Sequence, residues 1–242
     1  MIIKSCKEVD VTERFPQSYC KVYLLHVQID DVEERAAQMI QEITSTSWIT
    51  KLAPVDRVSF TARAKATITK LANEILAKVS TTVTEEFGEY MVSMSAQDAL
   101  FQSLQHSKIP LAELFKEQKS GNPGFDFHTE SSSCLVAFGE AKYSGSENPY
   151  TRALSQVVSF IDLAKDDMEL TDLKCFVSEK AIQNALNGDK AYIAAFSINT
   201  TRPDLIFNKV LKSDLLTRLV LYPELYLIGV EVNDSATRTG GE

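Results

Sequence analysis

The sequence lacks paired cysteines. Its four cysteines, Cys6, Cys20, Cys134 and Cys175, are far apart, and no two of them form a Cys-x-x-Cys pair. Structural zinc sites usually contain such pairs, and reduced thiols are the rule in the cytosol. The pattern argues against a zinc ribbon, and we assign no chemistry to the cysteines.

Long hydrophobic runs are also missing. A membrane-spanning helix needs roughly 20 consecutive apolar residues, and no segment approaches that length. Residues 1–10 carry Lys4, Lys7 and Glu8 and have no apolar core of the kind that a signal peptide needs. We expect a cytoplasmic protein without a membrane partner.

Basic residues are in the minority. The chain has 25 Lys and Arg against 33 Asp and Glu, a formal net charge of -8. Binding of nucleic acid draws its affinity from basic side chains that release counterions from phosphates. Tight autonomous binding is therefore not expected, and a nucleic-acid enzyme of this composition needs a local basic strip or a partner that delivers its substrate.

The remaining composition is that of an ordinary globular protein. Of the 242 residues, 44% are hydrophobic and 24% are charged, enough for one large core or two modest ones. We divide the chain into an N-terminal α/β segment of unknown role (residues 1–80), a second domain (81–234) and a polar tail (235–242) that we expect to be disordered.

Patterns of apolar residues, caps and turn residues predict alternating strands and helices. Asp30 and Asp31 are at the position of a helix N-cap, and Lys119 to Gly124 is a turn signal before a hairpin. The predicted strands are 19–29, 125–129, 134–143, 175–177, 192–198 and 225–232. The predicted helices are 32–43, 58–79, 85–106, 109–118, 150–164, 179–186 and 205–219. This order indicates an α/β fold with a mixed central β-sheet flanked by helices.

The predicted hairpin carries the charged residues of most interest. Side chains alternate faces along a strand, so Glu140 and Lys142 share one face of the second strand, and Asp126 shares a face with His128 on the first. If the two strands pair, an Asp, a Glu and a Lys meet over one patch of sheet. We expect that patch on the solvent side, with the apolar residues on the opposite face packing the core.

These residue types suit metal-dependent phosphodiester chemistry. Mg²⁺ is usually held by one or two carboxylates together with waters and substrate phosphate, and Asp126 and Glu140 supply two. Such a metal, Mg²⁺ or Mn²⁺, polarises the phosphate and generates a hydroxide-like nucleophile. Lys142 can orient the attacking water or offset charge developing on phosphorus.

The order of these residues resembles the PD-(D/E)XK nuclease superfamily. Gly124-Phe125-Asp126 and Glu140-Ala141-Lys142 match its Asp and Glu-x-Lys half-motifs. The resemblance implies a restriction-endonuclease-like core, a metal ligand at Glu89 on the preceding helix and a site role for Gln156 on the following helix. The superfamily's proline before the aspartate is replaced by Phe125, with Pro123 displaced upstream, and that proline is commonly replaced in the superfamily.

A narrower resemblance is to the HamA family of nuclease subunits from Hachiman anti-phage defence. Its segments match Gly88-Glu89, Ile109-Pro110-Leu111, Gly124-Phe125-Asp126 and Gly139-Glu140-Ala141-Lys142, within residues 87–160. By this resemblance the substrate is DNA and the partner is a superfamily 2 helicase subunit. The match says little about the N-terminal segment.

Less specific readings remain open for each residue. Asp126, Glu140 and Lys142 can form a structural ion pair, and Glu89 can simply favour the helix dipole. Gln156 can be solvated, and we place His128 at the rim of the site.

Alternatives remain open for the basic strip and for the whole protein. Lys116, Lys119 and Arg152 are candidates for the strip, or ordinary surface charges. The rival functions are a catalytically silent partner-binding module on a nuclease fold and a recombination or repair nuclease.

Overall fold

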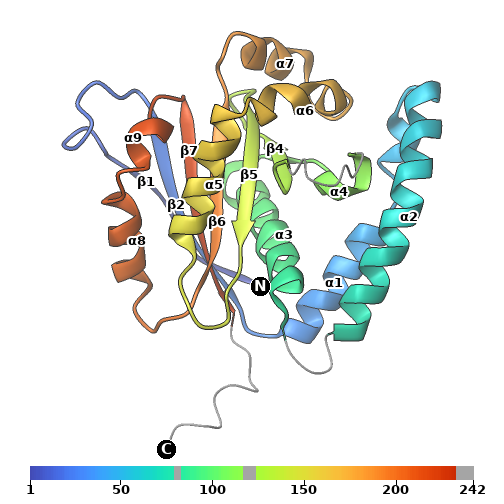
Figure 1. The fold of residues 1–242 in the computed structure, drawn as a ribbon, viewed down its shortest axis with the longest axis horizontal. Coiled ribbons are helices and arrows are strands. Elements are labelled where there is room, and N and C mark those ends of the chain that lie inside the picture. Colours follow the sequence, from blue (N-terminus) through green and yellow to red (C-terminus); the bar gives the residue numbers. More distant parts are fainter. Residues whose placement is uncertain (79–82, 117–123, 233–242) are drawn as a thin grey trace, which may run out of the picture.

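Four parallel strands form the centre of a seven-stranded mixed sheet (Figure 1). The computed structural model describes residues 1–78, 83–116 and 124–232. The strands in spatial order are β1 (Ile2–Val9), β2 (Lys21–Ile29), β7 (Glu224–Val232), β6 (Ala191–Ile198), β5 (Val136–Lys142), β4 (Phe127–Glu130) and β3 (Ser107–Lys108). β1 is antiparallel to β2, and β4 and β3 extend the other edge in antiparallel pairing.

Helices cover both faces of this sheet (Figure 1). One face packs against α1 (Val32–Thr44) and α3 (Glu85–Leu104), and the long α2 (Pro54–Lys78) contacts α1 and α4 (Ala112–Phe115). The other face packs against the helices that follow β5 and β6. These are α5 (Tyr150–Asp162), α6 (Lys165–Leu173), α7 (Glu179–Leu186), α8 (Pro203–Leu211) and α9 (Leu216–Leu219), and the 3₁₀ turn η1 (Ile49–Lys51) precedes α2.

Burial on both faces explains the composition of the central strands. β6 is buried along its whole length and reads AYIAAFSI, an almost continuous apolar run. Parallel strands covered on both sides have such runs, because both side-chain orientations meet a core. Tyr192, Ala194 and Phe196 pack on the α5 face, and Ile193 and Ala195 pack on the α3 face.

The structure confirms the predicted mixed α/β fold and most of its elements. Asp31 caps α1, its carboxylate accepting from the N–H of Glu34 at 2.8 Å. β4 and β5 pair as the expected antiparallel hairpin, although β4 begins two residues later than predicted. The two N-terminal strands belong to the same sheet, since β2 pairs along its length with β7. The boundary proposed near residue 80 and the tail at 235–242 lie largely outside the described residues.

Two expectations about elements were wrong, and some described elements were not predicted. Residues 175–177 form a turn rather than a strand, and Phe176 packs there against the rings of Trp48, Phe60 and Phe115. The predicted helix 205–219 is two helices, α8 and α9, separated by Lys212–Leu215. β1, η1, β3 and α6 were not predicted. Among the described residues, no helix has the length and apolar content to cross a bilayer.

Candidate active site

The candidate site lies at the start of β4, where β5 continues with β6 on one side and no strand on the other. Phe127 pairs with Gly139, so the last three residues of β5 extend beyond β4. Asp126, just before β4, fills this gap: its N–H donates to the Gly139 carbonyl, and its Oδ2 accepts from the Ala141 N–H, both at 2.9 Å. The carboxylate of Asp126 thus replaces a strand hydrogen-bond partner and is fixed beside Glu140.

Glu140 points into the interior beside α5. It shares the face of β5 that carries Val136 and Phe138, and its side chain has no exposed surface. Its Oε1 accepts from Nζ of Lys142 at 2.6 Å. No hydrogen-bond donor in the described part of the chain reaches its buried Oε2.

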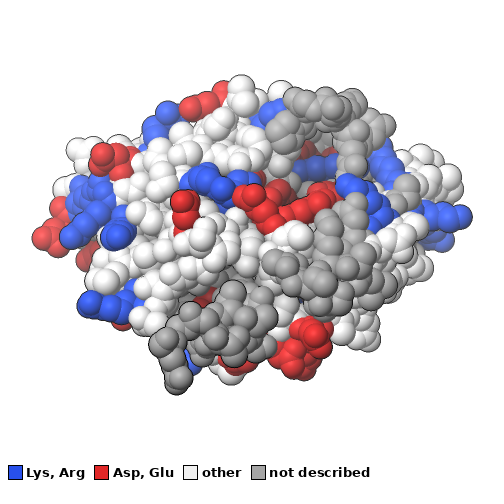
Figure 2. Space-filling view, turned by 60° about the horizontal axis from the view of Figure 1, so that its bottom comes forward, with Lys and Arg blue, Asp and Glu red and all other residues white. Residues whose placement is uncertain are grey.

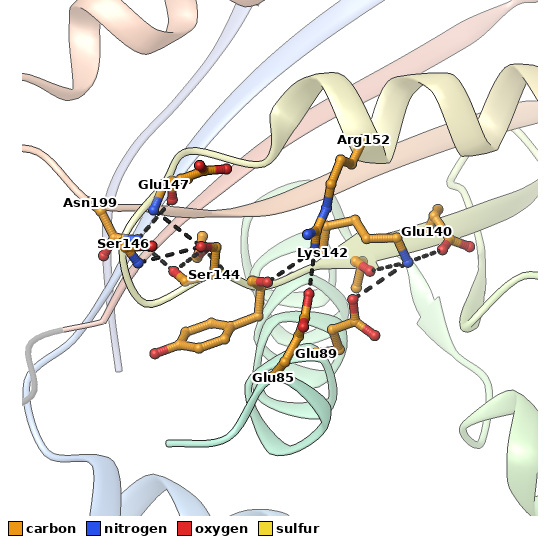
Figure 3. Close-up of polar contacts among 12 residues, drawn as sticks. Glu85, Glu89, Glu140, Lys142, Ser144, Ser146, Glu147, Arg152 and Asn199 are labelled. Carbon is orange, nitrogen blue, oxygen red and sulfur yellow. Dashed lines mark hydrogen bonds and ion pairs between the residues drawn. The ribbon is translucent and has the colours of Figure 1, made fainter. Parts of the chain in front are cut away.

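Lys142 links β5 to α3 (Figure 3). Its Nζ lies 3.5 Å from Oε1 of Glu89 on α3, in addition to its contact with Glu140. The side chain of Glu89 is 31% exposed, whereas that of Lys142 is 12% exposed. We call Glu89, Asp126, Glu140 and Lys142 the edge site.

The edge site borders an open groove between the start of α3 and α5. The groove has a volume of about 980 Å³, and its lining includes Glu85, Glu89, Lys142, Arg152 and Gln156. Acidic side chains gather near the middle of the face shown in Figure 2, with basic side chains beside them. Ligands that enter this groove therefore meet charges of both signs.

Arg152 spans the mouth of the groove. Its guanidinium donates to Oε1 of Glu85 at 2.6 Å and to the carbonyl of Tyr143 at 3.2 Å (Figure 3). Both ends of the ion pair with Glu85 are about half exposed or more. Such surface pairs contribute little to stability, so a phosphate can compete with Glu85 for Arg152 at small cost.

The carboxylates of the edge site disturb one another. Burial and the neighbouring Asp126 carboxylate raise the pKa of Glu140 well above its ordinary value. Burial also raises the pKa of Asp126 and of Glu89. Burial alone would lower the pKa of Lys142, but Glu140, Asp126 and Glu89 outweigh it and raise that pKa. The site thus favours the charged form of Lys142 and disfavours the ionised forms of its three carboxyl groups.

These donors fit a hard divalent cation. Two carboxylates lie side by side, and one buried carboxylate oxygen has no donor among the described residues, an arrangement that a cation relieves. In the part of the chain that the structure describes, no group of three or more His, Cys, Asp or Glu side chains already has the arrangement of a complete metal site. Lys142 lies between Glu89 and Glu140 instead.

Several expectations about the site need correction. Glu140 is buried rather than on a solvent-facing side of the sheet, because α5 covers that face. His128 is not a rim residue: it is fully buried, and its Nε2 lies 2.6 Å from Oε2 of Glu169. Lys116 is occupied by an ion pair with the same glutamate at 2.6 Å. Lys119, the third candidate for a basic strip, lies outside the described residues.

Sequence patterns did not predict a role for Glu169, which contacts the segment just before Asp126. It lies on α6, 43 positions after Asp126 in the chain, and nothing in the local pattern of Lys165–Leu173 distinguishes it from the acidic residues around it.

Comparisons of the chain with protein-family models, with curated proteins and with solved structures found no match.

Proposed function

We propose that the chain is a metal-dependent nuclease that hydrolyses phosphodiester bonds of DNA at the edge site. The observation that carries the proposal is the meeting of Asp126, Glu140 and Lys142 at one sheet edge beside an open groove. The buried, unsatisfied oxygen of Glu140 supports a cation there. The resemblance to PD-(D/E)XK nucleases, and to the HamA family among them, agrees with this residue set.

Each residue of the edge site has a distinct task in this proposal. Asp126 and Glu140 would hold Mg²⁺ or Mn²⁺, and Glu89 would add a further carboxylate from α3. The chemistry supplied by such an ion would be polarisation of the scissile phosphate and a hydroxide-like nucleophile. Lys142, kept charged by its three acidic neighbours, orients the attacking water and offsets negative charge on phosphorus. Gln156 lines the groove on α5 and contacts the substrate or water.

We infer that a partner delivers the DNA. The net charge of -8 and the glutamates along the groove weaken binding of a polyanion. A superfamily 2 helicase subunit is the partner that the HamA resemblance implies, with the chain acting as the effector of an anti-phage complex. The partner would supply affinity and this chain would supply the cut.

The test is plasmid cleavage by the purified chain with Mg²⁺ or Mn²⁺, alone and with the helicase subunit. We expect Glu140→Gln and Lys142→Met to reduce the cleavage rate by at least ~100-fold, the loss typical when a group that stabilises developing charge is removed. Glu147→Gln is the matched control, since Glu147 is an exposed loop residue after β5. Wild-type protein that leaves the plasmid intact under every condition would contradict the proposal and favour the silent binding module. Equal cleavage rates for wild type and Glu140→Gln would show that the edge site does not carry the reaction.

A further inference from the structure

A buried carboxylate holds the peptide that precedes Asp126. Oε1 of Glu169, on α6, accepts from the N–H of Phe125 at 3.0 Å. Phe125 itself is buried against Phe138 and Phe160. The residue next to a proposed metal ligand is therefore tied to a helix that contributes no ligand of its own.

The other polar group of Phe125 is held as well. Nζ of Lys116, directly after α4, donates to the Phe125 carbonyl at 2.7 Å and pairs with Oε1 of Glu169 at 2.6 Å. Glu169 thus binds the N–H of Phe125 and Lys116 binds its C=O, and the charges of the two side chains neutralise each other. The positive charge of Lys116 also acts on Asp126, whose pKa it lowers against the larger effect of burial.

His128 completes this cluster from β4. Its Nε2 lies 2.6 Å from Oε2 of Glu169, and no partner within the described ranges reaches its buried Nδ1. The shared proton therefore belongs on Nε2, which donates to the carboxylate. Both oxygens of Glu169 are then satisfied, as a buried carboxylate requires. We call Lys116, His128 and Glu169 the Glu169 cluster.

Gly124 makes the close approach of Glu169 possible. A Cβ at this position would lie 2.1 Å from Oε1 of Glu169 and 3.1 Å from Nζ of Lys116. No side chain larger than hydrogen fits there without moving the carboxylate away from the Phe125 N–H. The glycine of the Gly-Phe-Asp segment thus has a steric reason in this chain.

The helix that carries Glu169 is itself anchored. At the start of α6, Nζ of the buried Lys190 lies 2.6 Å from both Asp166 and Asp167. The hydroxyl of Tyr192 donates to Asp166 at 2.7 Å. Charge-assisted bonds of this kind restrict the helix more than apolar packing alone, so Glu169 has little freedom to shift.

We propose that Glu169 is a positioning residue which, with Lys116 and His128, fixes the backbone at Phe125 and so directs the Asp126 carboxylate toward Glu140 at the metal site. The inference rests on the proposed nuclease function and adds to it residues that touch neither metal nor substrate. Substitution of residues that orient metal ligands in this way typically lowers metal affinity or activity by about 10–100-fold.

The test measures Mn²⁺ affinity by calorimetry and the plasmid cleavage rate for full-length Glu169→Ala and Glu169→Gln. We expect Glu169→Ala to weaken both by about tenfold or more. Glu169→Gln keeps an amide oxygen for the Phe125 N–H, so we expect it to fall between Ala and wild type. Hydrogen exchange at Phe125 and Asp126 should quicken in Glu169→Ala, while exchange at Ala194 in β6 stays unchanged.

Asp172→Ala and Asp172→Asn are the matched controls. Asp172 lies on the same helix and forms a partly exposed ion pair with Arg63, at 3.3 Å, so both variants should keep wild-type affinity and rate. If Glu169→Ala fails to fold, Glu169→Gln must still bind Mn²⁺ more weakly than Asp172→Asn. Unchanged values in the Glu169 variants, beside an active wild type, would overturn this inference alone. A wild type that neither binds Mn²⁺ nor cuts DNA would overturn the proposed function and this inference with it.

Discussion

At the scale of single residues, His106 is a buried imidazole whose environment opposes protonation. It is 1% exposed, with Nδ1 2.9 Å from Oγ1 of Thr129 and Nε2 3.0 Å from the hydroxyl of Tyr226. That hydroxyl donates to Glu224 and so accepts from Nε2. Burial lowers the pKa of His106 to about 4, against the opposing effect of Glu224.

This pKa predicts an acid-sensitive contribution to stability. Between pH 6.5 and 4 the unfolded chain binds a proton at this histidine and the folded chain does not, so the free energy of unfolding decreases as the pH falls through that range. The shift corresponds to a loss of up to about 3 kcal/mol. Urea titrations between pH 7.5 and 4 should show a smaller loss for His106→Gln than for wild type. Parallel pH profiles of the two proteins would show that His106 does not contribute in this way.

The sequence identified the charged residues of the edge site but not their burial. Strand alternation correctly predicts that Glu140 and Lys142 share a face of β5, because that depends only on local geometry. It does not say whether a helix covers the face, and α5 does. Glu169, the partner of His128, lies 41 positions away on a helix that was not predicted. The local sequence pattern therefore indicated neither the burial of His128 nor the role of Glu169.

At the scale of elements, predictability follows from how local the determinants are. α7 begins and ends as predicted. Its N-cap is local, since the hydroxyl of Ser178 accepts from the N–H of Ala181, three residues further along the chain. The antiparallel pairing of β4 with β5 needed only a short connection. By contrast, most of β1 is exposed and lacks alternation, and the charged sequence of α6 is organised by distant partners such as Lys190. Those two elements depend on tertiary contacts that no local window contains.

The contact between α3 and β5 depends on a glycine. This glycine gives a second prediction about the stability of the folded chain. A Cβ on Gly88 would lie 2.1 Å from Cγ of the buried Tyr143 ring. Glycine inside a helix costs up to about 1 kcal/mol relative to alanine, so a Gly88→Ala change would stabilise an isolated helix. Here overpacking, which costs about 1–3 kcal/mol in a well-packed interior, should outweigh that gain and displace Glu89 from Lys142.

We therefore expect Gly88→Ala to lower the free energy of unfolding by about 1–2 kcal/mol, measured by urea denaturation. Combining it with Tyr143→Leu, which removes the ring, should cost less than the sum of the two single changes. Strictly additive effects would mean that the ring moves aside freely and that α3 is not held at its distance by this contact.

At the scale of the whole molecule, the edge site is rich in acidic side chains and the chain as a whole carries a net negative charge. The parallel strands β5, β6 and β7 bury both faces, so most charged side chains lie on helices and loops around them. Lys142 and Arg152 are the basic side chains among the described residues that line the groove, against three glutamates. The groove therefore offers few basic contacts to a phosphate backbone.

This charge distribution predicts a shallow salt dependence for DNA binding by the chain alone. Each neutralised phosphate contributes about -0.9 to the slope of log affinity against log salt, so two contacts predict a slope near about -2. Binding should be measured by fluorescence anisotropy without divalent metal, so that the DNA stays intact. Arg152→Gln should flatten the slope by about one, whereas Lys180→Gln should leave it unchanged, because α7 lies at the opposite end of the molecule from the start of α3 (Figure 1). A slope steeper than about -5 would require a basic surface elsewhere, and the need for a partner that delivers the DNA would then disappear.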